Sequence, residues 1–130
     1  MTLTIDTSVL VKIEKGDQGV LEKIKNIKEH DTSSPCITFI AYFEFIQGIN
    51  QRNPKNKEKA LNLLNLFRFA APTKLTASIM NDLKYKYEKL GKVFTLSDLL
   101  IASQCIENNL TLVTADKQFE TIEELKKVIL

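Results

Sequence analysis

The sequence predicts an α/β fold in which helices cover both faces of a parallel sheet. Short apolar runs alternate with stretches of helical periodicity along the whole chain. At 130 residues with a hydrophobic fraction of 44%, the chain has the size and apolar content of one domain with a continuous core. No repeat, low-complexity tract or interdomain linker interrupts it. Residues 1–130 are therefore expected to form a single domain.

The first half of the chain begins with a predicted strand and continues with helices. In order, the predicted elements are strand 3–5, helix 9–16, helix 20–30, strand 36–38 and a helix from 40 to about 53. In the helices the apolar residues recur at a spacing of three or four. Thr7 or Ser8 is expected to cap the first helix, and Gly16 to end it. Pro54 stops the third, because the residue before a proline avoids the helical conformation.

The second half repeats this alternation. Its predicted elements are helix 55–66, strand 69–71, helix 76–90, helix 98–108, strand 110–113, and a tail with a helical turn and a last edge strand. Gly91 is expected to close the helix before it, and Ser97 to cap the helix after it. The helix from 98 to 108 is apolar on most sides, which predicts extensive burial.

Composition excludes several classes of protein. A net charge of +2 is too small to indicate nucleic-acid binding by itself. The N-terminus lacks the pattern of a signal peptide, and no apolar stretch approaches the roughly 18 residues that span a bilayer. Cys36 and Cys105 lie in apolar contexts without a CxxC pair, so both are expected to be buried free thiols. These features predict a cytoplasmic protein with no membrane contact.

Four carboxylates interrupt otherwise apolar or hydroxyl-rich stretches: Asp6, Glu44, Asp98 and Asp116. An ionised carboxylate in a partly buried place costs several kcal/mol unless a partner compensates it. Asp6 and Asp116 each follow a predicted strand, and ligands of parallel sheets bind beyond the carboxyl ends of the strands. One shared divalent cation would compensate all four, and Mg²⁺ or Mn²⁺ prefers such oxygen ligands.

Each acid also has a simpler explanation. Asp6 can be a helix cap, Asp98 can interact with a helix dipole, and Asp116 can be an ordinary turn residue. Glu44 lies in the middle of a helix, where a cap is impossible, but it can pair with a lysine or serve an interface. Gly48, one turn further on, costs helix stability and suggests a close approach at that point.

Other candidate residues are basic. His30 adjoins a polar loop and is expected at the surface, where it cannot form a histidine-based zinc site alone. A cluster of positive charges could contact phosphates or could simply be a solvated helix start: Arg52, Lys55, Lys57 and Lys59. No glycine-rich phosphate loop or nucleophile elbow is present.

The motifs around the four acids resemble those of the PIN-domain ribonucleases, and more narrowly the VapC-like toxins of toxin–antitoxin pairs. The similar segments follow the family's order over nearly the whole chain: the strand into Asp6, Glu44 to Gly48, Ser97 to Ala102, and Leu112 to Phe119. The resemblance implies a three-layer PIN-like sandwich with a parallel sheet of about five strands. It also implies hydrolysis of RNA phosphodiesters with Mg²⁺ or Mn²⁺ as cofactor, a small antitoxin partner, and a homodimer.

The resemblance further assigns roles to residues. Asp6, Glu44, Asp98 and Asp116 would be the catalytic acids, and all but Glu44 are expected as metal ligands. Thr7 or Thr114 would order the site through its hydroxyl. The basic cluster is a possible RNA contact because of its charge, and the resemblance assigns it no role.

Two other fold families with acids at strand ends match the motifs less well. A receiver-like domain needs an acid after its middle strand, where this chain reads FAAPTK, and a haloacid-dehalogenase-like phosphatase needs a second aspartate where Ser8 stands. Within PIN-like proteins, two functions besides that of a toxin fit the same motifs. One is a catalytically silent binding module, and the other is a ribonuclease that processes RNA without an antitoxin.

Overall fold

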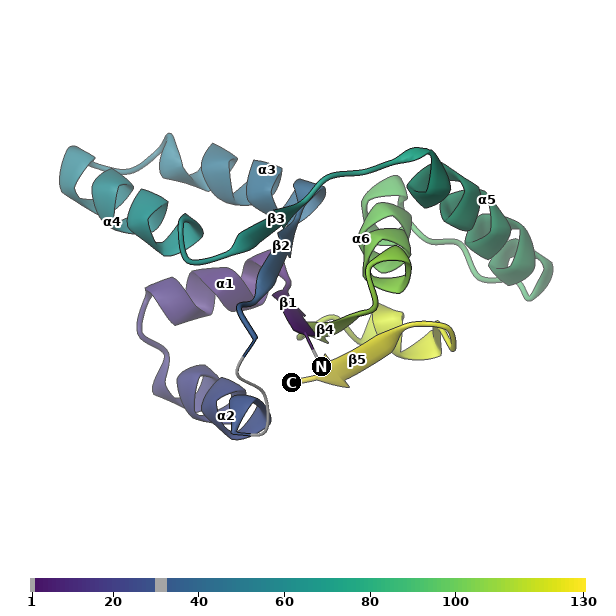
Figure 1. Cartoon of the computed structure of the whole chain (residues 1–130), viewed down its shortest axis with the longest axis horizontal. Coiled ribbons are helices and arrows are strands. Elements are labelled where there is room, and N and C mark those ends of the chain that lie inside the picture. Colours follow the sequence, from purple (N-terminus) through teal and green to yellow (C-terminus); the bar gives the residue numbers. More distant parts are fainter. Residues whose placement is uncertain (1, 30–32) are drawn as a thin grey trace.

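The chain folds around a five-stranded parallel sheet, which confirms the predicted fold (Figure 1). The computed structural model describes residues 2–29 and 33–130. The strands are β1 Thr2–Ile5, β2 Cys36–Thr38, β3 Arg68–Ala70, β4 Leu110–Thr114 and β5 Lys126–Ile129, and their order across the sheet is β3-β2-β1-β4-β5. The chain moves outward in one direction from β1 to β3 and in the other through β4 and β5. The topological switch point therefore lies between β1 and β4.

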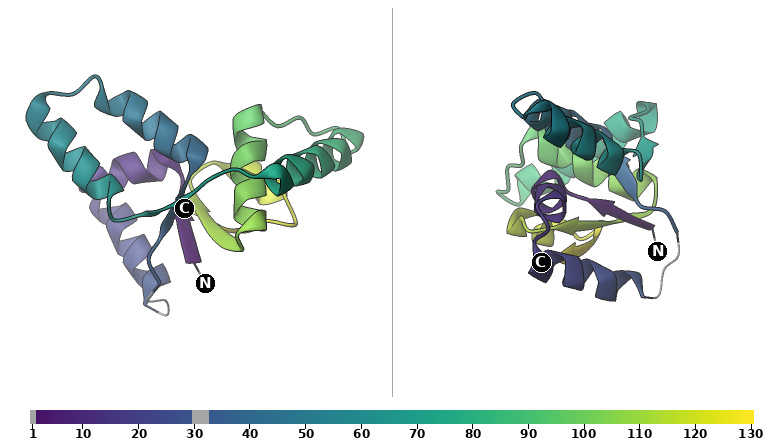
Figure 2. Two further views of the ribbon diagram at one scale, coloured as in Figure 1. Left: turned by 45° about the horizontal axis from the view of Figure 1, so that its top comes forward. Right: turned by 90° about the vertical axis from the view of Figure 1, so that its left-hand side faces the viewer.

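Helices cover both faces of this sheet. Across the described residues these are α1 Thr7–Glu14, α2 Gln18–Lys28, α3 Phe39–Ile49, α4 Pro54–Leu64, α5 Lys74–Lys89 and α6 Leu96–Glu107, with a 3₁₀ helix η1 at Lys117–Thr121. Figure 2 shows α1 to α4 on one side of the sheet, and α5 and α6 on the other. The predicted helical turn and edge strand of the tail are present as η1 and β5.

Every predicted helix forms, but each begins one or two residues earlier than its apolar periodicity indicates. A polar side chain caps each start and accepts a backbone N–H of the first turn: Asp6, Asp17, Thr38, Asn53, Thr73 and Thr95. The expected cap at Thr7 or Ser8 is therefore wrong, and so is the expected cap at Ser97. Thr95 has extended backbone and reaches the N–H of Asp98 at 3.1 Å, which leaves Ser97 inside the first turn.

Two glycines end helices as expected. Gly16 and Gly91 adopt φ values of +76° and +79°, which a side chain disfavours. The close approach expected at Gly48 is wrong, because a Cβ atom built there meets no atom within 4 Å. Gly48 lies on an exposed part of α3 and faces open space.

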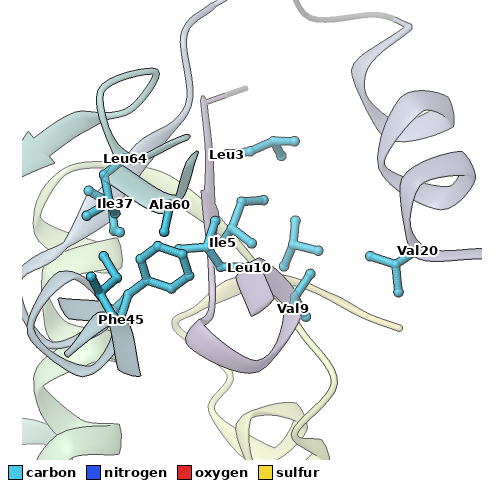
Figure 3. Close-up of a cluster of buried hydrophobic side chains, with 12 residues drawn as sticks. Leu3, Ile5, Val9, Leu10, Val20, Ile37, Phe45, Ala60 and Leu64 are labelled. Atoms are coloured by element: carbon cyan, nitrogen blue, oxygen red, sulfur yellow. The ribbon is translucent and has the colours of Figure 1, made fainter. Parts of the chain in front are cut away.

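The core is divided by the sheet into two clusters. The first joins β1 to α1, α2, α3 and α4, with the Phe45 ring only 1% exposed among aliphatic side chains (Figure 3). The second packs α5 and α6 against β4 and η1. Cys36 and Cys105 are buried and free, as predicted, and burial raises the pKa of the Cys105 thiol so that it stays protonated. In the described ranges, no helix has both the length and the apolar character needed to cross a membrane.

Candidate active site at the carboxyl edge of the sheet

Strand pairing brings Asp6 and Thr114 together at the topological switch point. Ile5 pairs with Val113, and the Asp6 N–H donates to the carbonyl of Val113 at 3.0 Å. Thr114, the last residue of β4, donates its hydroxyl to Asp6 Oδ2 at 2.7 Å. The same hydroxyl accepts the Asp116 N–H at 3.0 Å. One buried threonine thus links two of the predicted site acids.

Asp6 caps a helix and also belongs to the group of predicted site acids. Asp6 Oδ1 accepts the Thr7 N–H at 2.8 Å and caps α1, while Oδ2 accepts from Thr114. Each oxygen of a carboxylate can accept more than one hydrogen bond, so both oxygens keep capacity for a further partner. The half-buried carboxylate is therefore fixed in orientation but not saturated.

Glu44 reaches the cluster through Thr7. The Thr7 hydroxyl donates to Glu44 Oε1 at 3.1 Å, which joins the start of α1 to the middle of α3. Glu44 is exposed. Its side-chain partner among the described residues is this hydroxyl rather than a lysine, so the explanation by a simple ion pair fails.

Asp98 and Asp116 complete the acidic group. Burial raises the pKa of Asp98, the charges of Asp116 and Asp6 raise it further, and a hydrogen bond with Thr95 opposes them. Asp98 is therefore close enough to Asp116 and Asp6 for their charges to act on it. Asp116 also caps η1 by accepting the Gln118 N–H at 2.9 Å, so its expected turn role is real as well.

The donor set matches Mg²⁺ or Mn²⁺ in chemistry, because it consists of carboxylate and hydroxyl oxygens. Its geometry is not that of a finished metal site: within the ranges described, no group of three Asp, Glu, His or Cys side chains is placed to hold one ion. Burial is the main cause of the raised pKa of Asp98, and a cation would relieve the further rise that comes from the charges of Asp116 and Asp6. The residues are of the right chemical type for a divalent ion, but their side chains are not yet placed around a common point.

The residues of the predicted basic cluster differ in how the structure holds them. Arg52 forms an ion pair with Glu14, and its guanidinium lies 5.6 Å from the centre of the Phe45 ring. Lys55, Lys57 and Lys59 lie on α4 without this kind of anchoring. The expectation for His30 falls outside the described residues.

Sequence reasoning missed Gln104. Its side chain is fully buried in α6, where Oε1 accepts the Phe39 N–H at 3.1 Å and Nε2 donates to the Ala70 carbonyl at 2.7 Å. Gln104 thus ties the helix of Asp98 to the start of the helix of Glu44. A long polar side chain within the apolar segment LLIASQCI was the available signal.

The chain belongs to the PIN domain family, whose model matches residues 3–125. None of the curated proteins matches it significantly. Among solved structures it is similar to a chain of VapBC2 from Rickettsia felis bound to a promoter DNA fragment, with 22% identity and a TM-score of 0.85 over 100% of this chain and 99% of that one. DNA-bound VapBC from Salmonella typhimurium shows 19% identity and a TM-score of 0.80, over 99% and 98%. VapBC-1 from nontypeable Haemophilus influenzae shows 20% identity and a TM-score of 0.79, also over 99% and 98%. The resemblance to PIN domains of the VapC-like type is confirmed for the fold.

Proposed function

We propose that this protein is a metal-dependent endoribonuclease and the toxin of a toxin–antitoxin pair. The observation that carries the proposal is the arrangement around Asp6: in a PIN domain, its carboxylate is held by Thr7 and Thr114 at the switch point, within electrostatic reach of Asp98. Ligands of open parallel sheets bind at this position.

The role that we propose for each residue follows from these contacts. Asp6, Asp98 and Asp116 would hold the ion, while Thr7 and Thr114 orient the carboxylates of Glu44 and Asp6. Mg²⁺ or Mn²⁺, when bound, stabilises charge on the scissile phosphate and acidifies water beside it. Glu44 is exposed and held at one oxygen by Thr7, so it can accept a proton from the attacking water.

The antitoxin proposal rests on the similar structures, several of which are VapBC assemblies, and one is described as a toxin–antitoxin complex from Klebsiella pneumoniae. Action in the cytoplasm belongs to the same proposal. Co-expression with the product of the adjacent open reading frame tests the pairing: a specific partner should abolish cleavage and co-purify. Active protein with no inhibitory neighbour would favour RNA processing without an antitoxin.

The homodimer implied by the resemblance stays a prediction. Exposed aromatic rings gather where α3 meets the edge strand β3: Phe39, Phe43 and Phe69 are 42%, 50% and 52% exposed. Exposed clusters of this kind are common at protein interfaces. The particle mass in solution, measured by light scattering, tests the prediction directly.

Single-turnover cleavage of a panel of structured RNAs in Mn²⁺, Mg²⁺ or EDTA tests the enzyme. Asp6→Asn should lower the rate by orders of magnitude without loss of fold, because asparagine can still cap α1 but carries no charge. Asp17→Asn is the matched control, since Asp17 caps α2 through its own carboxylate away from the site. Equal rates for wild type and Asp6→Asn would assign the activity to a contaminant. No cleavage by the wild type with any ion would favour the silent binding module.

A further inference from the structure

A seam, which is the line along which α1 packs against α3, leads away from the acidic site. It starts at the hydrogen bond between Thr7 and Glu44. Four residues further along each helix lie Val11 and Gly48, which occupy the same helical faces because residues at i and i+4 are neighbours on a helix. Both line a hollow of about 540 Å³ that continues to the ends of these helices and to the first turns of α4.

The hollow is positively charged. Lys15, Arg52 and Lys59 line it together with one carboxylate, that of Glu14. The charges of Arg52 and Glu14 cancel each other, because the two side chains form an ion pair. In the part of the chain that the structure describes, neither Lys15 nor Lys59 forms an ion pair, so two ammonium groups share one hollow without a counter-charge. A cleft lined by charges of one sign raises the local concentration of counter-ions, which are anions here.

The hollow is also preformed. Arg52 is held by Glu14 and by the face of the Phe45 ring, so its position does not depend on a ligand. Gly48 leaves open space, where any larger residue would project a side chain. Asn56 lies in the N-terminal turn of the 11-residue helix α4, where the helix dipole favours negative charge.

We infer that this hollow binds a backbone phosphate of the RNA strand, adjacent to the phosphate that is cleaved. The inference rests on the proposed ribonuclease function and names its substrate-binding site. Gly48 is one turn from Glu44, about 6 Å along the helix axis, so a strand that leaves the acidic site along the seam reaches Lys15 and Lys59 next. Of the basic residues expected from sequence, Arg52 and Lys59 line this hollow, and Lys15 joins them.

The test measures binding of a single-stranded 12-nucleotide RNA in EDTA, where cleavage is blocked, as a function of salt concentration. Replacing both lysines, Lys15→Ala with Lys59→Ala, should lower the slope of log K against log salt by about 0.7, because the variant loses its contact with one phosphate of a single strand. The matched control, Lys12→Ala with Lys25→Ala, removes two exposed lysines outside the hollow and should keep the wild-type slope. Gly48→Glu should weaken binding at least tenfold while the protein melts normally, because it fills the hollow and adds a negative charge without crowding a neighbour.

The outcomes separate the two proposals. If the wild type neither binds nor cleaves RNA with Mn²⁺ or Mg²⁺, the ribonuclease proposal itself fails. If it cleaves RNA but both lysine pairs give the same slope, or Gly48→Glu binds normally, the hollow is not a phosphate site. Hexaglutamate is the competing probe: loss of its binding in the Lys15 and Lys59 variant, with RNA binding unchanged, would assign the hollow to an acidic protein segment and overturn the inference.

Discussion

The hydroxyl of Thr114 donates a hydrogen bond to the carboxylate of Asp6 at 2.7 Å, although the two residues are 108 positions apart. Parallel pairing of β1 with β4 produces this contact, because it aligns the carboxyl ends of both strands. Thr114 also accepts the N–H of Asp116. A single buried hydroxyl therefore sets the relative positions of two acids from opposite ends of the chain.

Thr114→Val should impair the site more than the fold. Valine has nearly the shape of threonine, but it leaves one oxygen of Asp6 unoriented and the Asp116 N–H without its acceptor. We expect a loss of stability of about 1–2 kcal/mol and a drop in single-turnover cleavage of at least tenfold. Thr114→Ser keeps the hydroxyl and should retain most of the rate. If valine and serine variants cleave equally well, the hydroxyl does not position the acids.

The fold was predictable because its signals are local. Each predicted strand and helix depends on apolar periodicity within about a dozen residues, and the structure contains all of them. The errors lie at helix starts such as Asp6 and Thr95, because the first turn depends on a polar cap upstream of the apolar stripe. Periodicity carries no information about that residue.

The candidate site was predictable only in part. The placement of Asp6 and Asp116 after strands indicated a common edge, and the contacts through Thr114 agree with it. The role of Gln104 depends on partners 65 and 34 residues away, which no local pattern reveals. The prediction for Gly48 was wrong because a glycine in a helix signals either close packing or an empty space, and only the surroundings distinguish the two.

Gln104→Met should destabilise the protein by about 2–4 kcal/mol. Methionine fills a similar volume but leaves the Ala70 carbonyl unpaired in a buried place, at about 1–3 kcal/mol, and the Phe39 N–H unpaired in a partly buried one, at about 1 kcal/mol. The measurement is the midpoint of denaturant unfolding. Gln47→Met changes an exposed glutamine of α3 and should stay within about 0.5 kcal/mol of wild type. If Gln104→Met changes the stability as little as this control does, the hydrogen bonds of Gln104 to Phe39 and Ala70 do not stabilise the fold.

Tyr87→Phe should lower stability in a pH-dependent way. Burial alone would raise the pKa of Glu124, but hydrogen bonds from Tyr87 at 2.7 Å, from its own backbone and from Lys86 outweigh it and lower the pKa. A carboxyl with a lowered pKa stabilises the fold above its unfolded pKa, and this contribution is lost as pH falls through the folded pKa. We expect a loss of about 1 kcal/mol at pH 7, since the carboxylate is partly exposed.

The difference between Tyr87→Phe and wild type should shrink as the pH falls below 4.5, the ordinary pKa of the glutamate. It should not vanish, because the Tyr87 hydroxyl also accepts the Glu123 N–H at 2.9 Å. Tyr85→Phe removes an exposed hydroxyl from the same helix and should match wild type at every pH. Melting curves recorded from about pH 3 to 8 give the comparison, and a pH-independent difference would exclude Glu124 as the cause.

Asp98→Asn should stabilise the metal-free protein and abolish most of its response to metal. Burial and the charges of Asp116 and Asp6 raise the pKa of Asp98, so the ionised side chain is unfavourable at neutral pH. Removing the charge should add on the order of 0.5 kcal/mol to the stability of the metal-free protein, since water still reaches the half-buried carboxylate.

The metal response is the second effect. In wild type, free Mg²⁺ or Mn²⁺ at 100 times its dissociation constant should add about 2.7 kcal/mol to the stability. Thermal melting with each ion and with EDTA measures both effects, with Asp82→Asn on α5 as the exposed control. An identical metal-induced shift in Asp98→Asn and wild type would show that Asp98 is not a ligand.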